Sequence, residues 1–416
     1  MASQRVCITT LEYPPDVGGV GESVCRIAHM LRDSGYEVHV AVFRSRHRSG
    51  SGYRRSECAT QIQDDVFVHR LQSAIRLDEP TLQDFLSEIY FQLKELHRQY
   101  SFDVFHAFFI NETGFLTTLL GQESRVPVIN SVRGSDLHKH VFDPKQHGQI
   151  VWTLENSTWV TFVSRELQQR ACILAQSLHI KSSAFWNSIQ PIDFGQLPTP
   201  ALADTLQHHA SNGIVIGATG KFRGKKGLEF LLDACAELST EMKLTLLLVG
   251  DFADKERTYW EQELQNSGIA DRVLITGLVE RRQGLAYLPY MDIFAVPSLR
   301  DGCPNSLLEA MLAGCAIVGT TVDAIGEILE DGQNALVVNP GSSAELVTAI
   351  RTLAQSPELR QQLGQAARVK ALHQLSSAVE QENWYKVYQQ VLQEPIQFPQ
   401  VAMVELHPFL MKRGTS

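Results

Sequence analysis

The chain has 416 residues, of which 44% are hydrophobic and 20% are charged, and its formal net charge is −9. This length exceeds what one hydrophobic core usually accommodates, so we expect an ordinary globular protein with two domains. The acidic balance argues against a general nucleic-acid-binding protein, whose surface would be basic.

Short β-type runs alternate with helical stretches along the chain, a pattern typical of parallel sheets covered by helices on both faces. The predicted strands fall into two series: 6–9, 37–43, 66–71, 103–107, 127–132 and 160–164, then 214–218, 243–249, 273–276, 292–296, 316–319 and 335–338. Each series opens with a strand that runs into a glycine-containing turn. We interpret them as two Rossmann-like, doubly wound halves that face each other across a cleft. Neither turn has the Gly-x-Gly-x-x-Gly spacing of a dinucleotide site, which argues against a dehydrogenase.

The α/β pattern predicts an N-terminal domain at 1–195 and a C-terminal domain at 196–378. The stretch 191–212 is rich in Pro, His and Ala and lacks clear periodicity, so it is the predicted linker. Apolar residues at helical spacing predict a last helix at 379–395, and 396–416 is expected to form a loosely packed tail.

The N-terminal half contains a glycine turn and a basic cluster. Gly18 and Gly19 lack side chains, so their backbone can approach a diphosphate or a sugar closely, and a plain strand-to-helix turn is the alternative. After the second predicted strand, arginines stand at 44, 46, 48, 54 and 55. We interpret this cluster as a solvated loop, with contact to an anionic acceptor or a membrane surface as the alternative.

His106 ends a predicted strand whose carboxyl end should point at the cleft, where ligands bind in such sheets. The residue is a candidate catalytic imidazole. If its side chain faces the opposite side of the sheet, His106 is instead a structural residue, because successive strand residues point in opposite directions.

The segment 220–227 (GKFRGKKG) directly follows an apolar run and precedes a helix predicted from about Leu228. A strand, a Gly-rich basic turn and a helix together present cations and N–H groups to a phosphate. Lys221 and Lys226 are therefore candidates to bind a phosphate group. A charged loop that keeps an exposed turn soluble is the alternative.

The segment 301–311 (DGCPNSLLEAM) places two acids at the ends of a tight turn that runs into a helix. Pro304 and Asn305 are good helix-start residues, and an uncapped first turn directs N–H groups and the positive helix end at an anion such as a diphosphate. Asp301 can accept hydrogen bonds from sugar hydroxyls, and Glu309 can bind a ribose diol. The alternative is a solvated surface helix with two unremarkable acids.

In order and spacing, these segments resemble the retaining glycosyltransferases of family 4, which have the two-domain GT-B fold. That family has an acid, seven residues and a glutamate continuing as Glu-Ala-Met-Ala-x-Gly, which here is Asp301 and the run 309–314 (EAMLAG). Further matches are 13–20 (YPPDVGGV), 133–136 (RGSD), 220–227, 326–329 (GEIL) and 331–338 (DGQNALVV), so the resemblance spans about 5–340.

The resemblance implies a retaining transfer of sugar from a nucleotide-diphosphate sugar, and it places Arg133 and Asp136 on the acceptor side. It also implies that the last helix crosses back to the N-terminal domain. The implied catalytic residues are His106, Lys221, Lys226 and Asp301. The implied donor-binding residues are Gly18, Gly19, Lys221, Lys226, Asp301, Gly302, Cys303, Pro304, Asn305, Ser306, Leu307 and Glu309.

The sequence departs from the family pattern at several of these positions. Lys221 stands where the family usually has Arg, which gives up the planar fork that binds a diphosphate at two points. Asp301 replaces the more frequent Glu and shortens the reach by one methylene. Phe108 occupies the place of a second histidine after His106, and Arg133 replaces the usual His of His-Gly-Ser-Asp.

We expect a metal-independent enzyme without a cofactor, because the sequence has neither an Asp-x-Asp turn at a strand end nor a His/Cys ligand spacing. The acceptor, whether a glycan, a lipid-linked sugar or a small molecule, is not specified. A non-catalytic sugar-nucleotide-binding protein and a GT-B epimerase or phosphorylase are the alternatives. Seven scattered cysteines, no signal peptide and no long apolar run predict a cytoplasmic protein.

Overall fold

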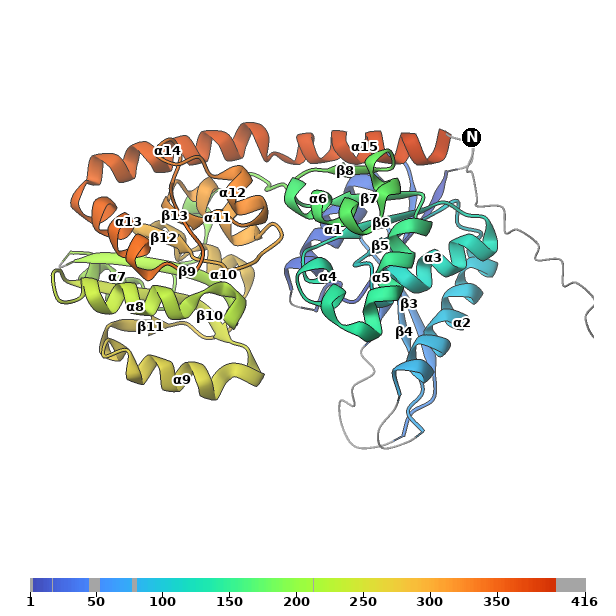
Figure 1. Ribbon diagram of the computed structural model, residues 1–416, viewed down its shortest axis with the longest axis horizontal. Coiled ribbons are helices and arrows are strands. Elements are labelled where there is room, and N and C mark those ends of the chain that lie inside the picture. Colours follow the sequence, from blue (N-terminus) through green and yellow to red (C-terminus); the bar gives the residue numbers. More distant parts are fainter. Residues whose placement is uncertain (1–2, 17, 45–52, 77–80, 212, 394–416) are drawn as a thin grey trace, which may run out of the picture.

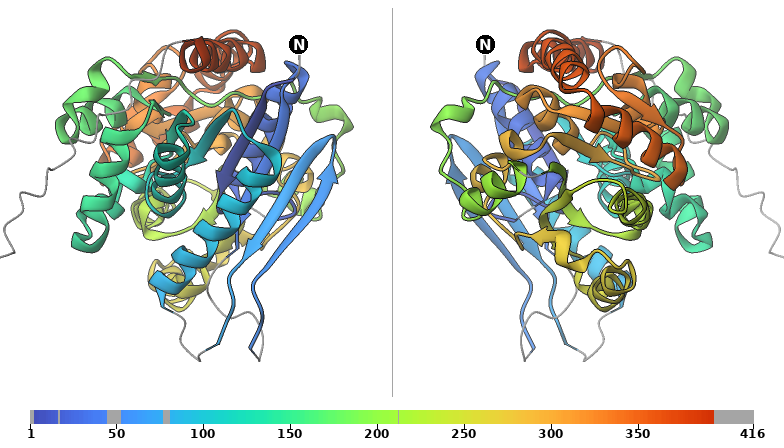
Figure 2. Two further views of the ribbon diagram at one scale, coloured as in Figure 1. Left: turned by 90° about the vertical axis from the view of Figure 1, so that its right-hand side faces the viewer. Right: turned by 90° about the vertical axis from the view of Figure 1, so that its left-hand side faces the viewer.

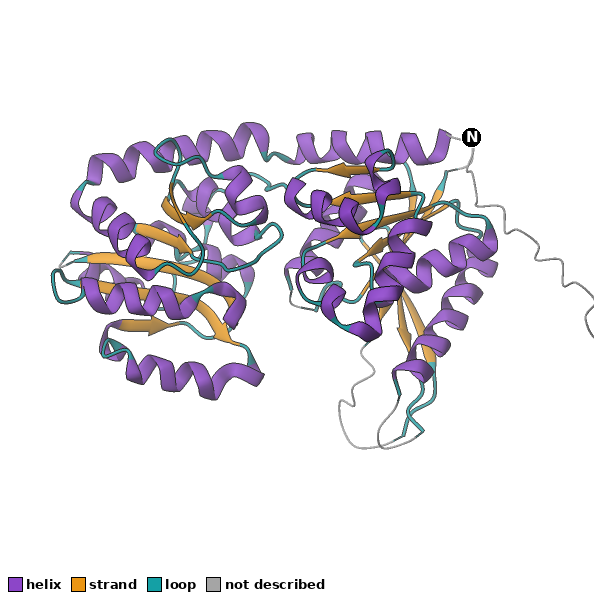
Figure 3. Ribbon diagram, viewed as in Figure 1, coloured by secondary structure: helices purple, strands orange, loops and turns teal. Residues whose placement is uncertain are grey.

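The computed structural model describes residues 3–16, 18–44, 53–76, 81–211 and 213–393. Two α/β units lie side by side, each with helices around a sheet (Figure 1, Figure 3). Within the described residues, one sheet has eight strands in the order β3-β4-β2-β1-β5-β6-β7-β8, and the other has six in the order β11-β10-β9-β12-β13-β14. The predicted α/β class with two Rossmann-like domains is therefore confirmed.

The sheet of the N-terminal domain is parallel except for the antiparallel pair of β3 and β4. β3 was missed from the sequence because nearly all its residues are exposed, so it shows no apolar pattern. The strands are β1 Arg5–Thr10, β2 Glu37–Phe43, β3 Glu57–Gln63, β4 Val66–Gln72, β5 Val104–Phe108, β6 Val128–Val132, β7 Trp159–Phe162 and β8 Ser182–Ala184.

The sheet of the C-terminal domain is parallel throughout its described strands. Its central strands are near-continuous apolar runs because helices cover both faces. The strands are β9 Ile214–Phe222, β10 Leu244–Phe252, β11 Val273–Ile275, β12 Ile293–Val296, β13 Ala316–Thr320 and β14 Leu336–Val338.

Helices connect most of the successive parallel strands, as crossover connections require, and β2, β3 and β4 follow one another without a helix in the described residues. In the N-terminal domain the helices are α1 Gly19–Asp33, α2 Leu82–Tyr100, α3 Glu112–Ser124, α4 Ser135–His138, α5 Pro144–Asn156 and α6 Arg165–Leu174. The C-terminal domain has α7 Ala203–Ala210, α8 Leu228–Leu238, α9 Arg257–Asn266, α10 Arg281–Leu285, α11 Asn305–Ala313, α12 Asp323–Ile328, α13 Ser343–Gln355 and α14 Pro357–Gln374.

The predicted linker 191–212 is not wholly irregular, because α7 lies inside it. This helix buries Ala203 and Leu206, and Leu206 belongs to a core cluster of the C-terminal domain. With eight residues and two buried positions, α7 is too short to show a helical period in the sequence.

The last helix, α15 (Ser377–Gln393), continues the direction of α14 and lies over the N-terminal domain (Figure 1, Figure 2). Trp384, Val387, Tyr388 and Val391 of α15 pack in the same core cluster as β1, β2 and α1. The chain therefore ends its described part on the domain in which it began.

An ion pair fixes the start of α15. The Glu380 carboxylate is 3% exposed and accepts hydrogen bonds from Arg26 Nε at 2.8 Å and from the Ser188 amide at 3.1 Å. Burial alone would raise the pKa of Glu380, but the Arg26 guanidinium and its hydrogen bonds lower it instead. Arg26 belongs to α1 and Ser188 to the connection after β8, so this acid joins three segments.

Of the three histidines that are fully buried in the described part of the chain, His39, His69 and His106, the last two make stability depend most strongly on pH. Burial lowers the pKa of His69 to about 4 and the pKa of His106 to about 3. Both groups are depressed below the value of about 6.5 in the unfolded chain, so folding stability is present above pH 6.5 and falls as the pH falls. We expect each histidine to remove about 2 kcal/mol of stability between pH 7 and pH 5.

Urea unfolding at pH 7 and pH 5 tests this expectation, with His69→Phe as the comparison. The variant should lose less stability than the parent chain over the same interval, because one buried imidazole is gone. Equal losses in the two proteins would show that His69 is not the group responsible.

Candidate functional site

α11 presents a free N-terminus at the carboxyl edge of the C-terminal sheet. It follows β12 through the turn 297–304 and begins at Asn305 with Pro304 as the N-cap. Among the described residues, no side chain caps this end of the helix. Its first amides and the positive end of its dipole therefore face the space in front of Asn305, which suits an anion.

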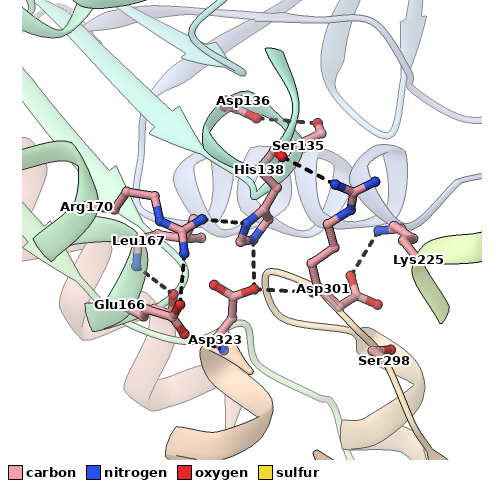
Figure 4. Close-up of polar contacts among 12 residues, drawn as sticks. Ser135, Asp136, His138, Glu166, Leu167, Arg170, Lys225, Ser298, Asp301 and Asp323 are labelled. Atoms are coloured by element: carbon pink, nitrogen blue, oxygen red, sulfur yellow. Dashed lines mark hydrogen bonds and ion pairs between the residues drawn. The ribbon is translucent and has the colours of Figure 1, made fainter. Parts of the chain in front are cut away.

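The basic turn between β9 and α8 meets the first acid of this segment. Lys226 Nζ lies 2.6 Å and Lys225 Nζ 3.2 Å from the Asp301 carboxylate, and Figure 4 shows the Lys225 contact. Burial alone would raise the pKa of Asp301, but the two ammonium groups outweigh it and hold the pKa at about 2. Asp301 is thus a carboxylate at neutral pH, with cations beside it.

Glu309 lies on α11 and forms an ion pair with Arg281. Its Oε1 accepts hydrogen bonds from Arg281 Nε at 3.1 Å and Arg281 NH2 at 2.9 Å. Burial raises the pKa of Glu309, and the Arg281 guanidinium opposes that shift. Arg281 NH1 also lies 4.0 Å from Glu22 of α1, so this end of the site reaches the N-terminal domain.

The N-terminal glycine turn lies opposite the start of α11. Asn305 Nδ2 donates to the Gly19 carbonyl at 3.4 Å. A Cβ atom on Gly18 would lie 2.0 Å from Glu12 Oε2, so the missing side chain leaves room for that carboxylate. Gly18 and Gly19 therefore border the same space as Asn305, although they come from the other domain.

Gly302 makes a second close approach between the domains. A Cβ atom on Gly302 would lie 2.4 Å from the Arg133 carbonyl, so only glycine fits there. The turn that carries Asp301 therefore rests directly on the β6–α4 connection of the N-terminal domain.

His106 does not reach the site, and its assignment as a catalytic residue is corrected. The side chain is fully buried, with Nδ1 2.9 Å from Tyr388 Oη and Nε2 2.8 Å from Ser131 Oγ. Its ring stacks on Phe108 and lies tilted against Trp384. His106 therefore attaches α15 to the sheet, which is the structural alternative that the sequence left open.

The structure gives the two acceptor-side candidates internal partners. The Asp136 carboxylate is fully buried and accepts from the amides of Ile110 and Arg133 at 3.3 and 3.4 Å, and burial raises its pKa to about 6. Arg133 lies over the Phe108 ring and donates to Asn187 Oδ1 at 2.7 Å, and burial lowers its pKa to about 10. Asp136 thus holds two loops of the N-terminal domain in place, and its acceptor-side position stays a prediction.

Several residues that the sequence predicts to contact the donor are buried in the structure or packed against its core. The Leu307 side chain is fully buried in a core cluster, and its amide donates to the Pro304 carbonyl, so direct donor contact by Leu307 is corrected. Cys303 packs against core clusters of both domains, and burial raises its pKa to about 12. Gly302 and Pro304 are buried, whereas Cys303, Asn305 and Ser306 are partly exposed, and Asn305 and Ser306 stand in the uncapped first turn of α11.

Lys221 lies apart from the Asp301 cluster. Its side chain is 52% exposed, and Nζ is 3.6 Å from Asp254. It therefore stands at the rim of the site, where it can add positive charge but does not fix Asp301.

Four site residues were not among the predicted ones: Glu12, Asn187, Lys225 and Arg281. Lys225 lies in the predicted basic turn, but only its neighbour Lys226 was predicted as a site residue. Asn187 donates to the Cys303 carbonyl at 3.0 Å and to Asn305 Oδ1 at 3.1 Å, a contact between distant segments that no local pattern reports. Glu12 and Arg281 lie in segments without a motif.

Some predictions fall wholly or partly outside the described residues. Arg46 and Arg48 of the basic cluster lie there, as does the predicted tail 396–416. Within the described part of the chain, no three His, Cys, Asp or Glu side chains are arranged to hold a metal ion. In the same part, none of the helices combines the length and the apolar character needed to span a bilayer.

Two family models match the chain. The model described as "Glycosyl transferase 4-like domain" matches residues 18–177, and the model described as "Glycosyl transferases group 1" matches residues 213–356. Together they cover the N-terminal glycine turn, the basic turn and the Asp301–Glu309 segment.

Similar proteins point the same way. The chain is 24% identical over 386 residues to N-acetyl-alpha-D-glucosaminyl L-malate synthase of Bacillus anthracis, covering 91% of this chain and 96% of that protein. It is 30% identical over 150 residues to 2-deoxystreptamine glucosyltransferase of Streptomyces kanamyceticus, covering 35% and 37% of the two chains.

Solved structures agree with the fold. Sucrose-phosphate synthase from Thermosynechococcus elongatus superposes with a TM-score of 0.75 at 18% identity, over 94% of this chain and 99% of that one. HepE of Anabaena superposes with a TM-score of 0.70 at 18% identity, over 92% of this chain and 99% of that one. The chain belongs to the glycosyltransferases of group 1, family 4, and it is a glycosyltransferase with the two-domain GT-B fold.

Proposed function

We propose that the enzyme transfers a sugar from a nucleotide-diphosphate sugar to an acceptor, with retention of anomeric configuration and without a metal ion. The observation that carries the proposal is the pairing of Asp301 with Lys225 and Lys226, next to the uncapped start of α11. This arrangement offers positive charge to a diphosphate and a carboxylate to the sugar attached to it.

The leaving diphosphate is the group that the site must stabilise, because negative charge grows on it as the anomeric carbon becomes oxocarbenium-like. The Lys226 ammonium and the amides of Asn305 and Ser306 supply that stabilisation, with Lys221 at the rim. These fixed charges support a reaction that needs no divalent cation. Glu309 is the candidate ligand for the ribose, with Arg281 as its partner before the donor binds.

Names of similar proteins support the donor class and the stereochemistry. HepE of Anabaena was crystallised with UDP-glucose. N-acetyl-alpha-D-glucosaminyl L-malate synthase and alpha-D-kanosaminyltransferase are named for α-linked sugars. An α-linked product from an α-configured nucleotide sugar is a retained configuration. Seven free cysteines support the proposed cytoplasmic location.

A panel of nucleotide sugars tests the proposal. The matching donor should raise the melting temperature by mass action, and transfer should release nucleoside diphosphate only when an acceptor is present. Proton NMR of the product should show the anomeric coupling of an α linkage, and EDTA should change the rate by less than about twofold.

Different results would select other functions. Binding of the donor without turnover across acceptors would identify a sugar-nucleotide-binding protein. Conversion of the donor into an epimeric nucleotide sugar without an acceptor would indicate an epimerase, and an inverted product or loss of activity in EDTA would contradict the proposed mechanism.

A further inference from the structure

Asp323, the first residue of α12, is an unusual residue at the boundary between the domains. Its φ is 45°, in the left-handed region that favours glycine. Its side chain is only 1% exposed. A buried acid in a strained backbone conformation persists only where its surroundings hold it, which makes its contacts informative.

Three contacts hold Asp323, and two of them come from the N-terminal domain (Figure 4). Its Oδ2 lies 2.7 Å from His138 Nε2 of α4, and its amide donates to Glu166 Oε2 of α6 at 2.8 Å. The third contact is within its own domain, where Oδ2 accepts from the Asp301 amide at 3.2 Å. One carboxylate oxygen thus touches both an imidazole of the N-terminal domain and the backbone of the sugar-binding acid.

The His138 ring is oriented by a neighbour. Arg170 NH1 lies 2.9 Å from His138 Nδ1, and Glu166 Oε1 holds Arg170 at 3.0 Å. A guanidinium can only donate, so Nδ1 accepts, and we assign the ring proton to Nε2, which faces Asp323. At the observed domain angle, Nε2 and the carboxylate are close but not well aligned for a hydrogen bond.

The turn that carries Asp301 depends on α12 at two adjacent residues. The Asp301 amide donates to the Asp323 carboxylate, and the Gly302 carbonyl accepts a hydrogen bond from the Ala324 amide at 3.1 Å. The other side of Gly302 rests on the Arg133 carbonyl of the N-terminal domain. The position of Asp301 is therefore set by how α12 meets the N-terminal domain.

We propose that Asp323 and His138 are a positioning pair that couples closure of the two domains to the placement of Asp301 in the donor site. The inference rests on the proposed function, because it gives the pair a role in the same site. Asp301 contacts the donor, whereas Asp323 and His138 act only through Asp301.

Hydrogen exchange on the chain without any ligand tests the coupling. Asp323→Gly removes the carboxylate and suits the positive φ, so the variant should fold. We expect exchange of the Asp301 amide to become about tenfold faster. His138→Phe should accelerate the same amide although His138 does not touch it, and His138→Gln, which keeps a donor near Nε2, should restore most of the protection.

The matched control is Asp65→Gly. Asp65 also has a positive φ, of 59°, and lies exposed in the β3–β4 turn, far from the domain boundary. Exchange at Asp301 should be unchanged in this control. If His138→Phe leaves the Asp301 amide as protected as in the parent chain, there is no coupling between the domains through this pair, and the inference is overturned.

Kinetics with the donor found in the panel provide the second readout. Asp323→Gly should lower kcat by about tenfold or more and leave the KM for the donor within about threefold, with an unchanged melting temperature. A normal kcat would overturn the inference even if exchange were faster. Full activity of Lys226→Ala would instead contradict the proposed function. The hydrogen-exchange experiment would still test the coupling through Asp323 and His138, because it needs no donor.

Discussion

Lys226→Ala is expected to lower kcat/KM for sugar transfer by a factor of about 1,000, equivalent to about 4 kcal/mol of transition-state stabilisation. The Lys226 ammonium is 19% exposed and lies 2.6 Å from Asp301. A diphosphate in front of α11 would meet this charge in a partly water-excluded site, where it is worth more than in bulk water. Lys225 cannot replace it, because Lys225 is more exposed, at 35%, and more distant from Asp301.

A second effect of the same substitution acts in the same direction. Without Lys226, burial would raise the pKa of Asp301 from its present low value. Lys225 still opposes that shift, so the acid loses its charge only when the pH falls to the raised pKa, where a protonated carboxyl group accepts fewer hydrogen bonds. As the pH falls, the variant should therefore lose activity at a higher pH than the parent chain does, which distinguishes this effect from simple removal of a phosphate contact.

Lys94→Ala is the matched control for Lys226→Ala. Lys94 also pairs with a carboxylate, that of Glu123, but it lies between α2 and α3 and is 46% exposed. Its removal should change kcat/KM by less than about twofold, since exposed ion pairs contribute little. If Lys226→Ala keeps more than about a tenth of the parent kcat/KM, Lys226 does not stabilise the leaving group.

The parts of this site that the sequence predicts are those with local causes. A strand, a glycine turn and a helix follow from neighbouring residues, so the basic turn and the start of α11 at Asn305 were both predicted. The pairing of Lys226 with Asp301 joins residues 75 positions apart. Its members were recognised separately, but no pattern in one sequence states that their side chains meet.

The role of His106 shows why the rest could not be predicted. Its strand and its position near the carboxyl edge of the sheet are local properties, and both favour the interpretation of His106 as a catalytic residue. Its structural role depends on Tyr388, which lies 282 residues away and contacts His106 only because α15 packs on the N-terminal sheet. Asp136 is similar, because its carboxylate binds the Ile110 amide, which lies 26 residues away in the sequence.

Asp323 and Arg281 were missed for a related reason. Each makes a side-chain contact across the domain boundary, Asp323 with His138 and Arg281 with Glu22, which no local pattern in the sequence reports. The positive φ of Asp323 is invisible in the sequence, since aspartate is only moderately favoured in that conformation. Contacts between domains are therefore the part of this site that needs a structure.

Glu380→Ala is expected to destabilise the N-terminal domain by about 3 kcal/mol. The Glu380 carboxylate is 3% exposed and the Arg26 side chain 13%, so the substitution leaves a poorly hydrated guanidinium without its partner. It also leaves the Ser188 amide without its acceptor. The expected fall in melting temperature is roughly 6 to 12 °C for a domain of this size.

Glu382→Ala is the control on the same helix, because Glu382 pairs with Lys386 four residues on and both side chains are 66% exposed. It should change the stability by less than about 0.5 kcal/mol. A double-mutant cycle with Arg26→Ala should recover part of the loss, since removing both charges leaves neither unpaired. Additive losses would mean that Glu380 and Arg26 do not stabilise each other, and then α15 would be held to the N-terminal domain by Trp384, Tyr388 and the Ser188 contact rather than by this ion pair.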